Sequence, residues 1–224
     1  MDIINSEYYS FEQFKSEIEE TYIIDGYEID YQLSIIKPLL KKIFINTDIQ
    51  VADTAQSRDS LKKKRQANNN EHRIGTAIHD IEPFTGYKGS PDLVIGRNLV
   101  YLNRKSACNC EYLVSVEIKQ PNISWEKHID QIKSHLSKIP YVIFTDCISW
   151  CFFTKSNIIN GVLQKPKIIC LKDANGNWLV GEKKTDEYLK NEFCIEFIEA
   201  PPEKWDELLS YIKKFCMRGK LESV

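Results

Sequence analysis

The sequence predicts an α/β fold in which a central mixed β-sheet is flanked by helices. Short apolar runs rich in β-branched and aromatic residues recur along the chain, as is typical of strands. Stretches with apolar residues at helical spacing lie before, between and after these runs. A length of 224 residues and a hydrophobic content of 42% suit one domain over 1–224. We expect its core at about 28–154, and a C-terminal elaboration with a β-hairpin region and a helix at about 155–224.

Two amphipathic helices are predicted near the N-terminus. The first covers 6–24, with its apolar face formed by Phe11, Phe14, Ile18 and Tyr22. The second covers about 27–44, and its apolar stripe consists of Ile29, Leu33, Ile36, Leu40 and Ile43. Pro38 should kink this helix or mark a junction, because proline lacks a backbone N–H. Glu28 and Gln32 lie along one margin of the stripe.

Strands and two further helices follow in order. We expect strands at 49–52, 72–79, 92–96, 99–102, 112–118, 140–145, 149–154, 167–171, 178–180 and 193–198. The polar segment 54–71 is expected to be a loop. A helix at 125–138 begins after Ser124, a residue type that favours N-caps. His128, Gln131 and His135 share one flank of that helix, from which a side chain can reach a neighbouring strand end. Pro201-Pro202 opens a final amphipathic helix.

Two carboxylates and an ammonium group are predicted to meet at neighbouring strand ends. Pro91-Asp92 enters one apolar run, and Glu117-Ile118-Lys119, 25 residues further on, lies in a second. Side chains two positions apart share one face of a strand, so Glu117 and Lys119 point the same way while Ile118 points into the core. A hydrolase uses such groups to hold a hard divalent cation beside a phosphodiester. A turn aspartate and an exposed salt bridge on a strand are the purely structural alternative.

Charge is unevenly distributed along the chain. The net charge is −2, yet 61–140 holds 13 Lys or Arg against 8 Asp or Glu, whereas 1–60 holds 5 against 12. A basic segment around an acidic motif favours a phosphate-binding protein, and a solvated loop is the structural alternative.

The absence of long apolar runs and the spacing of the cysteines indicate the cellular compartment. No apolar run approaches the roughly 20 residues of a membrane span, and the N-terminus lacks the apolar region of a secretory signal. The seven cysteines lack the paired C-x2-C spacing of a zinc site. We therefore expect reduced thiols and a cytoplasmic protein, or a nuclear one in a eukaryote, with no membrane partner.

The motif resembles the PD-(D/E)xK nuclease superfamily, and in particular the N-terminal nuclease domain of type I restriction enzyme R subunits. Glu28 precedes Pro38-Leu39-Leu40 by the family's ten residues, and 131–135 resembles the family's Q-x-x-x-Y motif. The segment 139–150 is similar to the strand and turn that follow in the family. This sequence has His135 for the tyrosine and Asp146-Cys147 for Asn-Gly. The resemblance covers about 28–153 and includes no helicase or translocase region, so we do not expect ATP-driven restriction by this chain alone.

The resemblance implies a restriction-endonuclease-like core and an endonuclease that needs Mg²⁺ or Mn²⁺. Asp92, Glu117 and the main-chain carbonyl of Ile118 would coordinate the metal, and Glu28 would complete or neighbour that shell. Lys119 would orient or deprotonate the attacking water and stabilise the transition state. Gln131 would support Lys119 or touch the nucleic acid. The candidates for phosphate contacts are Lys62, Lys63, Lys64, Arg65 and Arg73.

DNA is favoured over RNA as the substrate, and two alternatives stay open. An RNA endonuclease could use His79 and Glu82 beside Asp92 and Glu117, in the way that cap-snatching endonucleases add a histidine. Alternatively, a nuclease-like fold could bind nucleic acid or protein without catalysis. Cleavage of two strands would favour a homodimer, or a partner protein would supply specificity.

Overall fold

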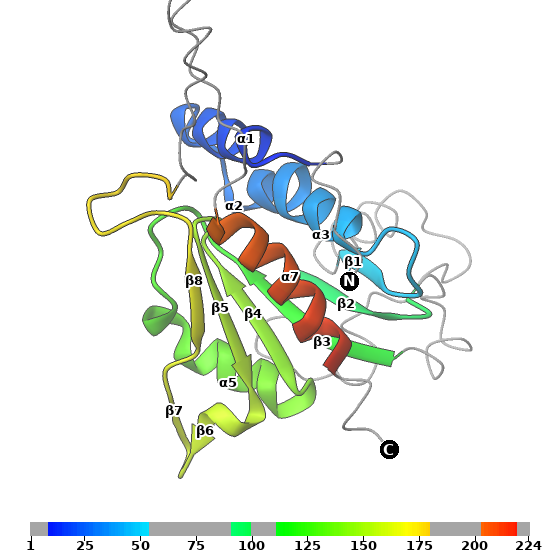
Figure 1. Cartoon of the computed structure of the whole chain (residues 1–224). Coiled ribbons are helices and arrows are strands. Elements are labelled where there is room, and N and C mark those ends of the chain that lie inside the picture. Colours follow the sequence, from blue (N-terminus) through cyan, green and yellow to red (C-terminus); the bar gives the residue numbers. More distant parts are fainter. Residues whose placement is uncertain (1–8, 54–90, 100–110, 180–202, 219–224) are drawn as a thin grey trace, which may run out of the picture.

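The fold is built on a six-stranded mixed β-sheet with the strand order β1-β2-β3-β4-β5-β8 (Figure 1). A computed structural model describes residues 9–53, 91–99, 111–179 and 203–218. The strands of the sheet are β1 (Gln50–Asp53), β2 (Leu93–Arg97), β3 (Glu111–Ile118), β4 (Tyr141–Thr145), β5 (Ser149–Thr154) and β8 (Lys167–Cys170). The predicted α/β class, with a mixed central sheet flanked by helices, is confirmed.

The centre of the sheet is the parallel pair β3 and β4, in which Glu117 lies opposite Phe144. All other neighbours in the sheet are antiparallel. A parallel pair needs a crossover connection. Here it consists of the 3-10 turn η5 (Trp125–His128) and helix α5 (Ile129–Lys138). Ser124 caps this turn as predicted, accepting a hydrogen bond from the backbone nitrogen of Glu126 at 3.4 Å.

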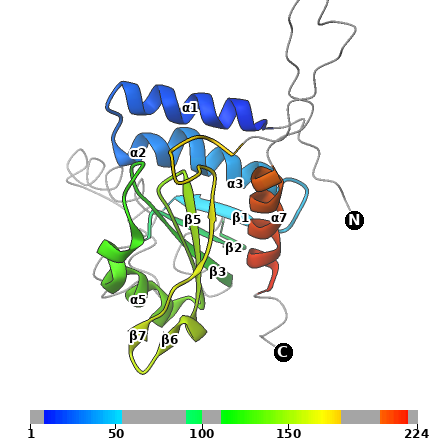
Figure 2. The ribbon, with the colours of Figure 1, turned by 60° about the vertical axis from the view of Figure 1, so that its left-hand side comes forward.

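The two faces of the sheet are covered by different helices, and strand alternation decides which residues meet each of them. Val116 and Ile118 of β3 point into the main core, together with side chains of α1, α3 and α7. Helix α5 packs on the opposite face, where Ile132 and Leu136 contact Phe144 and its neighbours. Figure 2 shows α5 and α7 on opposite sides of the sheet. Glu117, one position from both Val116 and Ile118, is thereby placed on the α5 face.

The N-terminal helices follow the prediction in outline and differ from it in detail. Helix α1 (Phe11–Ile23) is capped by Ser10 and buries Phe11, Phe14 and Ile18. Tyr22 was expected on the same face, but it is 59% exposed in the last turn of α1.

The predicted second helix is divided into α2 (Glu28–Asp30), a π-helical segment η2 (Tyr31–Ile36) and α3 (Lys37–Ile43). The change from π to α occurs at Lys37-Pro38, so the predicted junction at Pro38 is confirmed. A π turn is wider than an α turn and rotates the residues before it relative to those after it. As a result, Leu40 and Ile43 are buried as expected, whereas Ile29 is 39% exposed and the expectation for Ile29 is wrong.

The C-terminal half adds peripheral elements to the sheet. A 3-10 turn η6 (Lys155–Asn157) leads into a small hairpin of β6 (Ile158–Ile159) and β7 (Val162–Leu163). This hairpin lies in the C-terminal region where a β-hairpin is expected, but at residues where no strand is predicted. The strand expected at 178–180 is reduced, in the described part of the chain, to a single bridge between Lys172 and Trp178. The predicted final helix is confirmed as α7 (Glu203–Arg218), and its Trp205 and Ile212 are fully buried.

Several expected elements fall outside the described residues: the loop at 54–71, the strands at 72–79 and 193–198, and the strand at 99–102 except for Leu99. Within the described ranges, no helix is both long enough and apolar enough to cross a membrane.

Candidate metal centre

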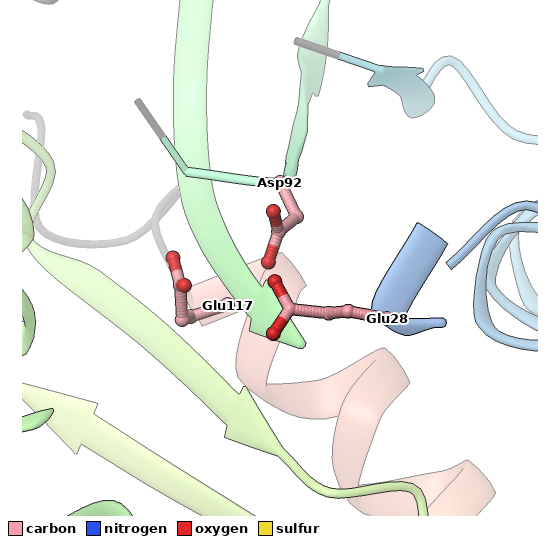
Figure 3. A group of neighbouring side chains, drawn as sticks. All are labelled: Glu28, Asp92 and Glu117. Carbon is pink, nitrogen blue, oxygen red and sulfur yellow. The ribbon is translucent and has the colours of Figure 1, made fainter. Parts of the chain in front are cut away.

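Three carboxylates converge at one end of β3. Asp92 directly precedes β2, Glu117 lies in β3, and Glu28 is the first residue of α2. One carboxylate oxygen from each residue lies within 4.8 Å of the others. Figure 3 shows the three side chains pointing toward one another from their separate elements. The structure therefore brings together the three acidic residues that are predicted from the sequence as metal ligands.

A hydrogen bond from the side chain of Gln120 holds the turn before Glu28 beside the end of β3. The side-chain amide of Gln120, two residues beyond that strand, donates to the carbonyl oxygen of Gly26 at 2.8 Å. Gly26 is buried in the turn between α1 and α2, and a Cβ at this position would lie 2.5 Å from the side chain of Thr21 and 2.9 Å from its carbonyl oxygen. Only glycine avoids this contact, so the turn can close tightly enough to begin α2 beside the sheet.

Lys119 lies between two of the three carboxylates. Its Nζ is 2.6 Å from Oε1 of Glu117 and 3.0 Å from Oε1 of Glu28. The exposed fractions of the Lys119 and Glu117 side chains are 12% and 2%. Burial, the largest single effect, disfavours the ammonium form. The charge and hydrogen bond of Glu117, the charge of Asp92 and the hydrogen bond to Glu28 together outweigh it, and so raise the pKa of Lys119. Without a metal, Lys119 is therefore a positive charge and a hydrogen-bond donor, and not a base.

Asp92 and Glu117 differ in how easily they ionise. Burial, and then the negative charge of Glu117, raise the pKa of Asp92 to about 8, although its Oδ2 accepts a hydrogen bond from the backbone nitrogen of Ile118 at 2.7 Å. Burial also opposes ionisation of Glu117, but the hydrogen bond from His135 and the charge of Lys119 together lower its pKa. The pair thus retains one proton near neutral pH, which a bound cation would replace.

The main chain of Ile118 is oriented toward the same cluster. Its N–H donates to Asp92, whereas the next N–H along the chain, from Lys119, donates to Thr145 of β4 at 2.8 Å. The N–H and C=O of one strand residue lie at the same edge of the strand. The carbonyl of Ile118 therefore faces the Asp92 side, as its predicted use as a metal ligand requires.

Gln32, Asp53 and Lys37 form a polar network that contacts the main chain of Asp92. Gln32, on the π-helical segment, is buried and donates through Nε2 to the backbone carbonyl of Asp92 and to Oδ1 of Asp53, both at 3.1 Å. Lys37 pairs with the other oxygen of Asp53 at 3.3 Å. This network joins the π-helical segment, which contains Gln32, to Asp53 of β1 and to Asp92 just before β2. π-helical turns are frequent at functional sites.

The donor set fits a hard divalent cation. Mg²⁺ and Mn²⁺ prefer carboxylate and carbonyl oxygen, which Glu28, Asp92, Glu117 and Ile118 provide, and the described residues place no cysteine in the cluster. Among the described residues, the ammonium group of Lys119 pairs with two of these carboxylates, those of Glu28 and Glu117.

Other predicted site residues are not part of this cluster. Gln131 is half-buried in the first turn of α5, and the hydrogen bonds of Lys119 to described side chains go to Glu28 and Glu117 rather than to Gln131. Its proposed support of Lys119 is therefore not seen. The basic candidates Lys62, Lys63, Lys64, Arg65 and Arg73, and the alternative ligands His79 and Glu82, lie outside the described residues.

Two residues of the site were not proposed as site residues. His135 is buried and contacts Glu117 at 3.1 Å, and Gln32 supports Asp92. Both had a signal in the sequence: His135 lies on the flank of its helix that was expected to face a strand end, and Gln32 follows Glu28 by four residues on the same margin. Neither signal identified a partner.

This chain was compared with protein-family models, curated proteins and solved structures. No protein-family model matches it. No curated protein and no solved structure gives a match either. The class of the site is therefore defined by its own geometry: an acidic, oxygen-donor cluster with an ammonium group at the edge of a mixed sheet.

Proposed function

We propose that this protein is a metal-dependent nuclease with a restriction-endonuclease-like core, which hydrolyses phosphodiester bonds in DNA. One observation carries the proposal: Glu28, Asp92 and Glu117, which lie far apart in the sequence, converge around the ammonium group of Lys119. The resemblance of Asp92 and of Glu117-Ile118-Lys119 to the PD-(D/E)xK motif supports the same function.

Each group has a role in this proposal. Glu28, Asp92, Glu117 and the carbonyl of Ile118 would hold Mg²⁺ or Mn²⁺. When bound, the metal would lower the pKa of a coordinated water and neutralise charge on the scissile phosphate. Lys119, which is charged in the metal-free site, would donate hydrogen bonds to the phosphate and stabilise the negative charge that develops in the transition state. The raised pKa of Lys119 favours this role over deprotonation of the water.

The test is cleavage of plasmid DNA, single-stranded DNA and RNA by the purified chain with Mg²⁺ or Mn²⁺. Asp92→Ala and Lys119→Ala are expected to abolish cleavage that the wild type shows. Asp130→Ala and Lys138→Ala are matched controls, because both side chains are exposed on α5 and neither belongs to the carboxylate cluster. Cleavage that persists in both site variants, or that never appears with any substrate, would refute the proposal.

The same samples address the alternatives. Preferential cleavage of RNA would shift the substrate class and would call for a test of His79→Ala. Nucleic-acid binding that is unimpaired in Asp92→Ala, with no metal uptake by the wild type, would instead indicate a binding module without catalysis. A homodimer, which cleavage of two strands would favour, would be detected by sedimentation as a complex of two chains with one DNA duplex.

A further inference from the structure

His135 of helix α5 contacts Glu117 of the carboxylate cluster on the face of the sheet that α5 covers. It lies in the second turn of α5, and the exposed fractions of the His135 and Glu117 side chains are 0% and 2%. The neighbouring Ile132 and Leu136 hold the helix against the sheet through an apolar cluster that includes Phe144. His135 is thereby held next to Glu117 by packing that does not involve the site.

The two oxygens of Glu117 contact different partners. Nε2 of His135 lies 3.1 Å from Oε2, and Nζ of Lys119 lies 2.6 Å from Oε1. An ionised carboxylate only accepts hydrogen bonds, so Nε2 must carry the proton in this contact. Oε1 is the oxygen that shares Lys119 with Glu28, and it therefore faces the carboxylate cluster. Oε2 faces α5.

We propose that His135 is a positioning residue, which donates Nε2–H to Oε2 of Glu117 and so fixes the rotation of this carboxylate with Oε1 toward the metal. The inference rests on the proposed metal centre and adds a residue that touches neither metal nor substrate. In the proposed reaction Lys119 leaves Oε1 of Glu117 to contact a phosphate. Because His135 still holds Oε2, Oε1 would keep its position toward the metal. Groups that orient a metal ligand in this way commonly change metal affinity or activity 10–100-fold when they are removed.

A purely structural histidine would fill the same space and satisfy the same buried oxygen. The two roles differ in what substitution does to metal binding. A structural residue affects the free energy of unfolding alone, whereas a positioning residue affects the affinity for metal in protein that is still folded. The two roles also differ in which substitution restores metal affinity. If His135 is a positioning residue, another side chain that donates a hydrogen bond to Oε2 of Glu117 should restore it.

The first measurement needs no variant. Nitrogen-15 NMR of the wild-type histidine rings reports which ring nitrogen carries the proton. We expect His135 to be protonated at Nε2, as either the neutral tautomer or the imidazolium ion. A neutral ring protonated at Nδ1 alone would overturn the inference, because such a ring cannot donate to Glu117.

The second measurement is Mn²⁺ affinity by calorimetry, with folding checked by circular dichroism. His135→Met keeps an apolar side chain of similar length without a donor, and its affinity should fall by about 10–100-fold. His135→Gln places an amide NH₂ near the position of Nε2, and its affinity should stay close to that of the wild type. His128→Met is the matched control, since His128 lies at the start of the same helix with its ring against Phe144, and its affinity should be unchanged.

The outcomes separate the two proposals. Wild-type binding with unchanged affinity in His135→Met refutes the role of His135 and leaves the metal centre standing. No Mn²⁺ binding by the wild type refutes the metal centre and this inference with it. If His135→Met fails to fold, the comparison of His135→Gln with the wild type and the protonation state of the wild-type ring decide the matter.

Discussion

The backbone nitrogen of Ile118 donates a hydrogen bond to Oδ2 of Asp92 over 2.7 Å. This contact joins the two halves of the motif, the aspartate before β2 and the end of β3. The backbone nitrogen of Asp92 in turn donates to the carbonyl of Val116 at 3.0 Å. Asp92 is thus fixed to β3 through both its main chain and its side chain, so the spacing between Asp92 and Glu117 does not depend on a bound metal.

Asp92→Asn should change how stability depends on pH. Burial and the charge of Glu117 raise the pKa of Asp92 from 3.8 to about 8, so between these values the folded state binds a proton that the unfolded state has lost. The free energy of unfolding of the metal-free protein should therefore fall as pH rises through this window, by up to about 1.4 kcal/mol per pH unit from this group. Asparagine cannot ionise and should remove this contribution.

The measurement is urea unfolding in the presence of a chelator at several pH values between 5 and 8. The difference between the wild type and Asp92→Asn isolates the group from all other titrating residues. Asp130→Asn, at an exposed position on α5, should leave the pH dependence unchanged. Parallel curves for the wild type and Asp92→Asn would show that the pKa of Asp92 is not raised.

Mn²⁺ should stabilise the protein more at pH 8 than at pH 6. At the lower pH the cation must displace the proton shared by Asp92 and Glu117, and this displacement weakens its binding. A cation at about 100 times its Kd should add about 2.7 kcal/mol to the free energy of unfolding. The melting temperature with and without Mn²⁺ measures the effect, and Glu117→Gln should lose it. An equal shift at both pH values would contradict the expected proton release.

Lys119→Met should separate metal binding from catalysis. The ammonium group occupies oxygens of Glu28 and Glu117 that a metal would use, so removing it should leave Mn²⁺ affinity unchanged or raise it. The turnover number should nevertheless fall, by about 10²–10³-fold if Lys119 supplies charge in the transition state. Calorimetry and single-turnover cleavage measure the two effects, with Lys138→Met as the control. A variant that loses metal affinity together with activity would show that Lys119 maintains the site rather than acting on the phosphate.

Gln32→Leu should destabilise the fold and loosen Asp92. The substitution removes the donor to the carbonyl of Asp92 and to Oδ1 of Asp53 in a buried setting. Loss of a partner for buried acceptors costs about 1–3 kcal/mol. Urea unfolding checks the value, and Ser34→Ala, at an exposed position on the same segment, should change it little. Near-equal stability of Gln32→Leu and the wild type would mean that this network does not hold the helical segment to the sheet.

Much of the arrangement could be predicted because it depends on local periodicity. Alternation along β3 indicated that Glu117 and Lys119 share a face while Ile118 is buried, and both statements are confirmed. Helical spacing located α1, α5 and α7 for the same reason. The convergence of Glu28 with Asp92 was suggested by the family spacing and is seen in the structure.

The features that were not predicted depend on tertiary contacts or on local irregularities, which the periodicity of apolar residues does not reveal. A regular α-helix was assumed across 27–44, and the π turn at 31–36 overturned the orientation expected for Ile29. His135 was placed on the correct flank of its helix, but its pairing with Glu117 depends on how α5 packs under the sheet. The short hairpin at 158–163 has only two residues in each strand, too few for an alternating pattern to be recognised.

The position of Lys119 between Glu28 and Glu117 has a consequence for how the protein is assembled in a cell. Zinc fingers and similar small domains remain unfolded until their metal arrives, because metal binding supplies the free energy of folding. This chain carries its own counter-ion, so synthesis and folding can be completed before any cation is acquired. Under the proposed function, a chelator should then inactivate the folded protein reversibly, and the supply of free Mg²⁺ or Mn²⁺ would determine when it cleaves DNA.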